Sequence, residues 1–184
     1  MKVWIALVHH PVRDRQGDII TTAVTNLDVH DIARSARTYD LAGYFVVTPI
    51  EAQRRLVERI LSHWREGPGA RRVPERTEAL ARCEVVDTVE EAIAAVGDRA
   101  GSPPQIITTT ARTSAKTSTY GEVSSDLEAR PGLILFGTGH GLAASELDRA
   151  DHVLAPIEPA SDYNHLSVRA AVAITLDRLF GTFD

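Results

Sequence analysis

The chain has 184 residues, of which 43% are hydrophobic and 24% charged, and its formal net charge is −5. This composition is typical of a globular domain with a hydrophobic core, so we expect residues 1–184 to form a single domain. The sequence has no apolar run of the roughly 20 residues that cross a bilayer and no signal peptide pattern, which predicts a cytoplasmic protein without a membrane span. Its single cysteine, Cys83, excludes an internal disulfide and a cysteine-based zinc cluster, and is expected to be a small buried hydrophobe.

Short β-rich runs alternate with helical ones along the chain. The expected strands are 2–8, 43–48, 83–87, 105–109, 133–136 and 152–154. The expected helices run from Asp28 as N-cap to Tyr39, from Pro49 to about Trp64, from a capping box at 88–91 to Arg99, and from Leu166 to Phe180. Residues 67–74 and 110–120 are expected to be loops. This alternation predicts an α/β fold with a mostly parallel sheet and helices on both faces.

Positive charge is concentrated in the middle of the chain. Residues 52–82 hold eight arginines against four glutamates. Arginine matches the geometry of phosphate and stacks on bases, which makes Arg71 and Arg72 candidate RNA contacts. The alternative is a solvated helix face without a ligand.

Three segments that could carry chemistry are 28–39, 133–142 and 154–174, and we expect them at the sheet edge where open α/β folds bind ligands. In the second, an apolar strand runs into Gly137, Gly139 and Gly141. Such glycines let a ligand approach backbone N–H groups, although a plain strand-to-helix turn would have the same pattern. Their even spacing does not match the dinucleotide fingerprint, which argues against a nucleotide-binding oxidoreductase.

Histidines are frequent but lack the spacing of a metal site. The pair His9 and His10 has His30 nearby in sequence, yet none of these pairs shows the helical spacing of a zinc enzyme, so we expect no metal. His9 and His10 follow the first strand beside the expected ligand edge, and they are therefore candidate RNA contacts.

Together these segments resemble the SPOUT class of RNA methyltransferases, knotted enzymes that use S-adenosylmethionine (SAM). Residues 134–142 are similar to that family's LLFGxEGxGL strand and loop, 154–157 to its IPM strand end, 165–171 to its NVSVAAA helix start, and 32–37 to its IxRTA segment. The match is closest to an uncharacterised bacterial subgroup that is sometimes fused to a tRNA guanine-N1 methyltransferase. His165 and Asp28 stand where the ribose methylases of the family have asparagine, so both a ribose 2′-hydroxyl and a guanine nitrogen stay open as the methyl acceptor.

The resemblance implies a homodimer with a deep trefoil knot in its C-terminal third, in which three neighbouring loops hold the cofactor. The implied cofactor contacts are Thr108, Thr109, Gly137, Thr138, Gly139, Gly141, Leu142, Leu154, Pro156, Ile157, Asn164, His165, Leu166 and Ser167. The implied activity is SAM-dependent methylation of RNA, with tRNA as the expected substrate. A module that binds SAM or RNA without catalysis is the main alternative.

Methyl transfer from a sulfonium has a neutral leaving group, so it depends on positioning and needs no metal. The acceptor does need activation. Arg34, in the segment similar to IxRTA, would stabilise a ribose oxyanion, whereas Asp162 or Asp28 would act as the base for a guanine N1 proton. Arg37, one helical turn from Arg34, is a further candidate RNA contact. The alternatives are an ordinary surface arginine at position 34 and a turn residue at position 162.

Overall fold

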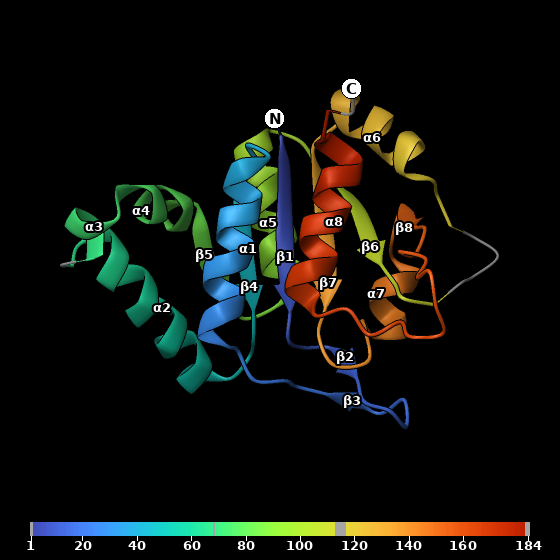
Figure 1. Ribbon diagram of the computed structural model, residues 1–184, viewed down its shortest axis with the longest axis horizontal. Coiled ribbons are helices and arrows are strands. Elements are labelled where there is room, and N and C mark those ends of the chain that lie inside the picture. The colour runs from blue at the N-terminus through green and yellow to red at the C-terminus, as the bar shows by residue number, and fades with distance from the viewer. Residues whose placement is uncertain (1, 68, 113–116, 183–184) are drawn as a thin grey trace.

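A computed structural model describes residues 2–67, 69–112 and 117–182, and its centre is a six-stranded parallel sheet (Figure 1). The strands are β1 (Val3–Val8), β4 (Gly43–Val47), β5 (Cys83–Val86), β6 (Gln105–Thr109), β7 (Gly132–Gly137) and β8 (His152–Leu154), in the spatial order β5-β4-β1-β7-β6-β8. The central strands β1 and β7 are apolar and almost completely buried, as strands covered on both faces must be. All six expected strands and their parallel arrangement are confirmed.

Helices cover both faces of this sheet and divide the core into two clusters. On one face α1 (Asn26–Thr38), α2 (Glu51–Arg65), α4 (Pro74–Ala81), α6 (Tyr120–Ala129) and α8 (Val168–Phe180) bury their apolar sides. On the other face lie α5 (Val89–Ala100) and, beside it, α7 (Ala144–Asp148). Cys83 is fully buried, as expected, and burial raises the pKa of its thiol. None of the described helices is long and apolar enough to cross a membrane.

The expectation of a loop over residues 67–74 was wrong, because α3 (Gly69–Arg72) and the start of α4 lie there. Pro74 occupies the first turn of α4, where its missing N–H costs nothing. The Thr77 hydroxyl donates to the Trp64 carbonyl oxygen at 2.9 Å, and Leu80 is completely buried. These contacts tie α4 back onto α2, and α2, α3 and α4 together form a lobe (the α2–α4 lobe) that projects beyond β5 (Figure 1).

The start of α1 differs from the expectation, and α6 and α7 lie where no helix was expected. The N-cap of α1 is Thr25 and not Asp28, since the Thr25 hydroxyl accepts from the Asp28 amide and donates to the Asp28 carboxylate at 2.6 Å. Helix α6 begins within the expected loop 110–120, where Thr119 forms a complete capping box with Glu122. Residues 113–116 of that loop lie outside the described residues. The N-cap expected at Thr88 is confirmed.

A stability measurement checks the packing of α4. Leu80→Ala removes a fully buried side chain, and we expect it to lower the free energy of unfolding by about 2–5 kcal/mol. The matched control is Leu56→Ala on α2, where the side chain is 43% exposed and the change should stay within about 0.5 kcal/mol. Urea unfolding of both variants distinguishes a packed α4 from a mobile segment, for which the two changes would be equal.

Candidate functional site

The loop that follows β7, residues 137–142 (the glycine loop), packs against a short hairpin of β2 (Val12–Arg13) and β3 (Ile19–Ile20). The His140 amide donates to the Arg13 carbonyl oxygen at 2.8 Å, and the Arg13 amide donates to the Gly141 carbonyl oxygen at 2.9 Å. A Cβ atom on Gly139, whose φ is +59°, would lie 2.9 Å from the same Arg13 carbonyl oxygen. The hairpin therefore occupies the space that glycine leaves free at position 139.

The other two glycines are also explained by the protein's own backbone. A Cβ atom on Gly137 would lie 2.6 Å from the Leu142 amide nitrogen, and Gly141 has a φ of +102°, which side chains rarely adopt. The protein's own backbone thus accounts for the three glycines without a ligand. The assignment of the loop to cofactor binding stays a prediction, and it depends on where the loop lies.

The predicted cofactor contacts lie in the loops that follow β6, β7 and β8. The structure brings these three loops to one edge of the sheet, because the three strands are neighbours and end on the same side (Figure 1). The Asn164 side chain donates to the Ala111 carbonyl oxygen at 3.5 Å, which links the loop after β8 to the loop after β6. Between the same segments, the Ser118 amide donates to the Val153 carbonyl oxygen at 2.8 Å and the Ala155 amide to the Ser118 carbonyl oxygen at 2.9 Å.

The predicted cofactor contacts differ in exposure. The side chains of Thr108, Leu142 and Leu154 are buried and support the loops from below. Thr109, Gly137, Thr138, Gly141, Pro156, Ile157 and Asn164 are half-buried, and Gly139, His165, Leu166 and Ser167 are exposed. Ser167 is the N-cap of α8.

The loop of residues 155–167 fits an adenosyl group in the chemistry that it offers. Among the described residues, most amides of this loop, including those of Ile157, Asn164 and Leu166, have no hydrogen-bond partner, so the loop offers donors to a ring edge. Leu166 is 46% exposed and Ile157 half-buried, which gives an aromatic base an apolar surface beside those amides. The described residues contain no group of three or more His, Cys, Asp or Glu side chains that could hold a metal ion.

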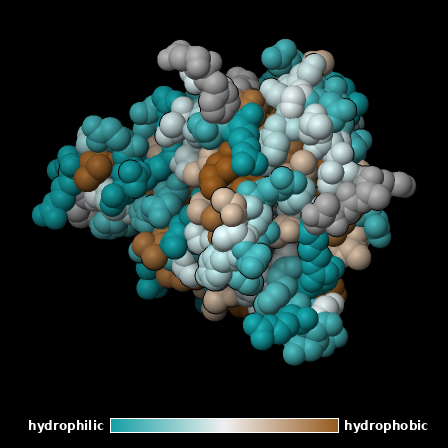
Figure 2. All heavy atoms as spheres, turned by 45° about the vertical axis from the view of Figure 1, so that its right-hand side comes forward, coloured by the Kyte–Doolittle hydropathy of each residue, from teal (hydrophilic) through white to brown (hydrophobic). Residues whose placement is uncertain are grey.

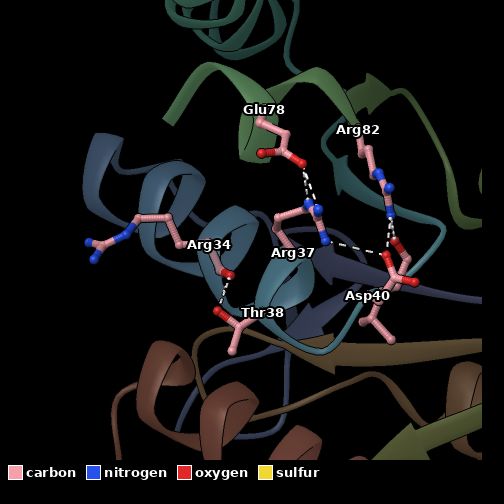
Figure 3. Close-up of polar contacts among 7 residues, drawn as sticks. Arg34, Arg37, Thr38, Asp40, Glu78 and Arg82 are labelled. Carbon is pink, nitrogen blue, oxygen red and sulfur yellow. Dashed lines mark hydrogen bonds and ion pairs between the residues drawn. The ribbon is translucent and has the colours of Figure 1, made fainter. Parts of the chain in front are cut away.

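The catalytic candidates Asp28 and Arg34 belong to a charged row across α1 and α8. The Arg169 Nε atom lies 3.7 Å from a carboxylate oxygen of Asp28 and 3.9 Å from one of Asp31, and Arg34 lies 3.7 Å from the other Asp31 oxygen. Asp28 is buried and Arg34 is 62% exposed, with its guanidinium extending away from the helix (Figure 3). Asp162 is exposed in the loop after β8, apart from this row.

Sequence reasoning missed Arg169, which neutralises this row from the first turn of α8. A signal was present, because Arg169 interrupts the segment 165–171 at a position where the resembling motif has alanine. A large charged side chain in place of alanine at a predicted site needs a partner, and Asp28 and Asp31 are that partner.

The RNA-contact candidates fall into different environments. Arg37 is held by Glu78, with a shortest N–O distance of 2.6 Å, and by Asp40 at 3.3 Å (Figure 3). Arg71 and Arg72 are exposed on the α2–α4 lobe, which Figure 2 shows as a mostly hydrophilic projection at the left. Neither has a carboxylate partner among the described residues.

The two neighbouring histidines also differ. His10 is half-buried, and its Nδ1 atom lies 3.0 Å from the Thr21 hydroxyl. His9 is completely buried beneath the glycine loop, so the expectation that it contacts RNA was wrong. Burial lowers the pKa of His9 to about 4, although nearby Asp28 opposes the shift, and the imidazole is therefore neutral at pH 7.

A groove of about 350 Å³ separates α1 from the α2–α4 lobe. Arg34, Arg37 and Arg76 line it together with Val73 and two glutamates, Glu75 and Glu78. The Arg76 guanidinium also stacks over Trp64 at 4.8 Å, and the rings of His30 and His63 meet the edge or face of Trp64 at 5.5 and 5.4 Å. The groove thus lies between α1 and the segment 73–79, which follows α3 with Arg71 and Arg72 in the chain.

Comparison with known proteins gives a consistent result. A family model described as SAM-dependent RNA methyltransferase matches residues 2–181. The tRNA (guanine-N(1)-)-methyltransferase of Nitratidesulfovibrio vulgaris is 48% identical over 97% of this chain, but the chain spans only 42% of that protein. An uncharacterized protein of Aquifex aeolicus is 42% identical over 97% of the chain and 88% of its own length.

Solved structures with low sequence identity share the fold. The SpoU methyltransferase AviRb from Streptomyces viridochromogenes aligns with 97% of this chain and 58% of its own, with a TM-score of 0.61 at 17% identity. The TrmH/SpoU tRNA modifying enzyme of A. aeolicus aligns with 97% of this chain and 73% of its own, with a TM-score of 0.58 at 15% identity.

Substitution of Gly139 checks that the hairpin requires this glycine. Gly139→Ala combines a positive φ with a contact to the Arg13 carbonyl oxygen, and we expect a loss of about 1–3 kcal/mol in the free energy of unfolding. Gly121→Ala on α6 is the control, because its Cβ atom meets nothing within 4 Å and should stabilise the helix by about 0.5–1 kcal/mol. Thermal unfolding measures both, and equal effects would show that position 139 tolerates a side chain.

The buried His9 predicts an acid-sensitive stability. Its pKa is about 4 in the folded protein and 6.5 in the unfolded chain, so the unfolded state binds the proton first as the pH falls. The neutral, buried His9 therefore adds about 3 kcal/mol to the free energy of unfolding above pH 6.5, relative to pH 4 and below. This contribution is lost as the pH falls from 6.5 to 4. Urea unfolding across this range should show a smaller pH dependence in His9→Asn, whereas His165→Asn, an exposed site, should behave like the wild type.

Proposed function

Because the chain belongs to the family of SAM-dependent RNA methyltransferases, we propose that it transfers a methyl group from SAM to RNA, with tRNA as its substrate and within a single domain. The observation that carries the proposal is the family match over residues 2–181, which includes all three loops at the ligand edge. The proposed tRNA substrate supports a cytoplasmic location for the reaction.

The atom that receives the methyl group stays open between a ribose 2′-hydroxyl and a guanine nitrogen. The N. vulgaris relative carries guanine-N1 in its name, but the matched segment is 42% of that protein and the named activity could lie in the remainder. The A. aeolicus protein, matched over 88% of its length, has no activity in its name. The name of the longer relative therefore supports a tRNA substrate more strongly than it supports a particular atom.

In this proposal the glycine loop and residues 155–167 hold the cofactor, with the free amides of Ile157 and Leu166 at the adenine edge. When bound, SAM supplies a methyl group on a positively charged sulfur. The row formed by Asp28, Asp31, Arg34 and Arg169 lies toward the acceptor, and Arg34 is its exposed member.

The same proposal includes a deep trefoil knot and a homodimer. The knot is supported by the route of the chain after β8, which is hydrogen-bonded to Ala111 and Ser118 on its way to α8. Helix α8 then packs between α1 and α6 on one face of the sheet (Figure 1). Leu27, in the first turn of α1, and Leu166, just before α8, are exposed apolar side chains. They support a subunit interface at the starts of these two helices.

The direct test of the function is methyl transfer. Purified protein with tritiated SAM should label bulk tRNA, and nucleoside mass spectrometry of the product identifies the modified nucleotide and atom. Isothermal titration with S-adenosylhomocysteine and with NAD distinguishes a methyltransferase from an oxidoreductase. Binding of S-adenosylhomocysteine without transfer to tRNA or rRNA would favour a non-catalytic module.

Arg34 is expected to act on the acceptor and not on the cofactor. Its guanidinium is exposed and only loosely paired with Asp31, so it is free to stabilise a developing negative charge. Arg34→Ala should bind S-adenosylhomocysteine like the wild type but lose about 10²-fold or more in methyl transfer. Arg34→Lys should recover little, because an ammonium does not reproduce the guanidinium fork. A wild-type rate in Arg34→Ala would make Asp162 the stronger candidate.

Arg71 and Arg72 are expected to bind RNA phosphates, because both are exposed, adjacent and without a carboxylate partner among the described residues. Replacing both by alanine should lower the slope of log affinity against log salt by up to about 2 units. The control is the double variant of Arg55 and Arg99, which pair with Glu51 and Glu84 and should leave the slope unchanged. Filter binding with tRNA at several salt concentrations makes the comparison. Equal slopes in both double variants would show that Arg71 and Arg72 form a solvated surface without RNA contacts.

A further inference from the structure

Beneath the glycine loop lies a line of polar side chains that the proposed mechanism does not use. His9 follows β1 and is completely buried, and its Nδ1 atom lies 2.9 Å from the Thr22 hydroxyl oxygen. The Thr22 hydroxyl is in short contact with the Thr138 hydroxyl, and the Thr138 hydroxyl donates to the Val8 carbonyl oxygen at 3.0 Å. This line joins β1, the segment before α1 and the glycine loop.

The protons in this line can point in only one direction. A threonine hydroxyl has one proton, and that of Thr138 is used on the Val8 carbonyl oxygen, which has no proton to give. Thr22 must therefore donate to Thr138, because two oxygens in short contact need a proton between them. With its own proton used, Thr22 accepts from His9, so the His9 proton is on Nδ1.

The other ring nitrogen of His9 leaves the Nδ1 bond as the one hydrogen bond of this ring among the described residues. With the proton on Nδ1, the Nε2 atom is a bare acceptor, and it is buried without a hydrogen-bond partner among the described residues. An unsatisfied buried acceptor costs on the order of 1–3 kcal/mol. An apolar residue in this position would avoid the cost, so the Nδ1 donor has a purpose besides filling the core.

Through Thr22, the Nδ1 donor of His9 acts on Thr138. The Thr138 amide donates to the Val8 carbonyl oxygen at 3.2 Å, and a Cβ atom on Gly139 would lie 3.5 Å from the Thr22 methyl group. Thr22 is fixed in turn by its own amide, which donates to the His9 carbonyl oxygen at 3.0 Å. The line thus holds the first turn of the glycine loop from below, while the hairpin holds it from the side.

We propose that His9 and Thr22 are positioning residues of the glycine loop, which hold Thr138 through a one-way chain of hydrogen bonds in the conformation that binds the cofactor. This inference rests on the proposed function for its link to SAM. The chain of hydrogen bonds itself is a property of the protein without cofactor, and it can be tested separately.

The test uses the adjacent threonines as a matched pair. Thr22→Val keeps the shape of the side chain and removes the hydroxyl, whereas Thr22→Ser keeps the hydroxyl. Thr21→Val is the control, because the Thr21 hydroxyl pairs with His10 and, in the described part of the chain, makes no hydrogen bond to the glycine loop. We expect about tenfold weaker S-adenosylhomocysteine binding in Thr22→Val, the effect of one lost hydrogen bond, and near wild-type binding in Thr22→Ser and Thr21→Val.

Two measurements without cofactor complete the test. Amide hydrogen exchange of residues 137–142 should be faster in Thr22→Val than in the wild type and unchanged in Thr21→Val. Nitrogen NMR of the wild type at neutral pH should show the His9 proton on Nδ1. Equal exchange in the two valine variants, or a proton on Nε2, would overturn the inference. Failure of the wild type to bind S-adenosylhomocysteine would instead contradict the proposed function, and the exchange and NMR results would still decide on the positioning role.

Discussion

Val8 and Gly137 lie opposite each other at the ends of two parallel strands, and this pairing decides where the functional groups of the protein meet. Parallel neighbours end on the same side of a sheet, so His9 emerges directly below the glycine loop. The Val8 carbonyl oxygen accepts from both the amide and the hydroxyl of Thr138, which extends the ladder of the sheet one residue into the loop. Because β6 and β8 continue the same sheet, their loops reach the same edge.

The sequence was most informative for the buried strands, whereas α6 was missed although Thr119 and Glu122 form a capping box at its start. Runs such as Val3–Val8 and Leu133–Phe136 leave few alternatives to buried parallel strands, and all six strands were predicted. Helix α4 was missed because Gly67, Pro74 and several arginines suggest a loop, while its stability comes from Leu80 and from the bond between Thr77 and Trp64. Such tertiary contacts outweigh weak local preferences, and no local pattern records them.

In the candidate site, too, local features could be predicted from the sequence and features that depend on tertiary contacts could not. The meeting of the loops after β6, β7 and β8 at one edge of the sheet could be predicted from strand ends and from motif resemblance, since both are local properties of the chain. The roles of single residues could not, because they depend on partners far away in sequence. Gly139 is explained by Arg13 and the burial of His9 by the loop above it, and the ion-pair partner of Asp28 is Arg169. A glycine pattern is therefore evidence of close packing, and the structure must show whether a ligand or the protein itself is the neighbour.

The surroundings of the two tryptophans give the protein a pair of built-in optical probes. Trp4 is 5% exposed in the core, so its emission follows the integrity of the sheet. Trp64 lies in the α2–α4 lobe, in contact with a guanidinium and two imidazole rings. Any molecule that displaces Arg76 or His63 from Trp64 alters the electronic environment of this indole and leaves that of Trp4 unchanged. Fluorescence of single-tryptophan variants can thus follow events at the lobe separately from unfolding, without an attached dye.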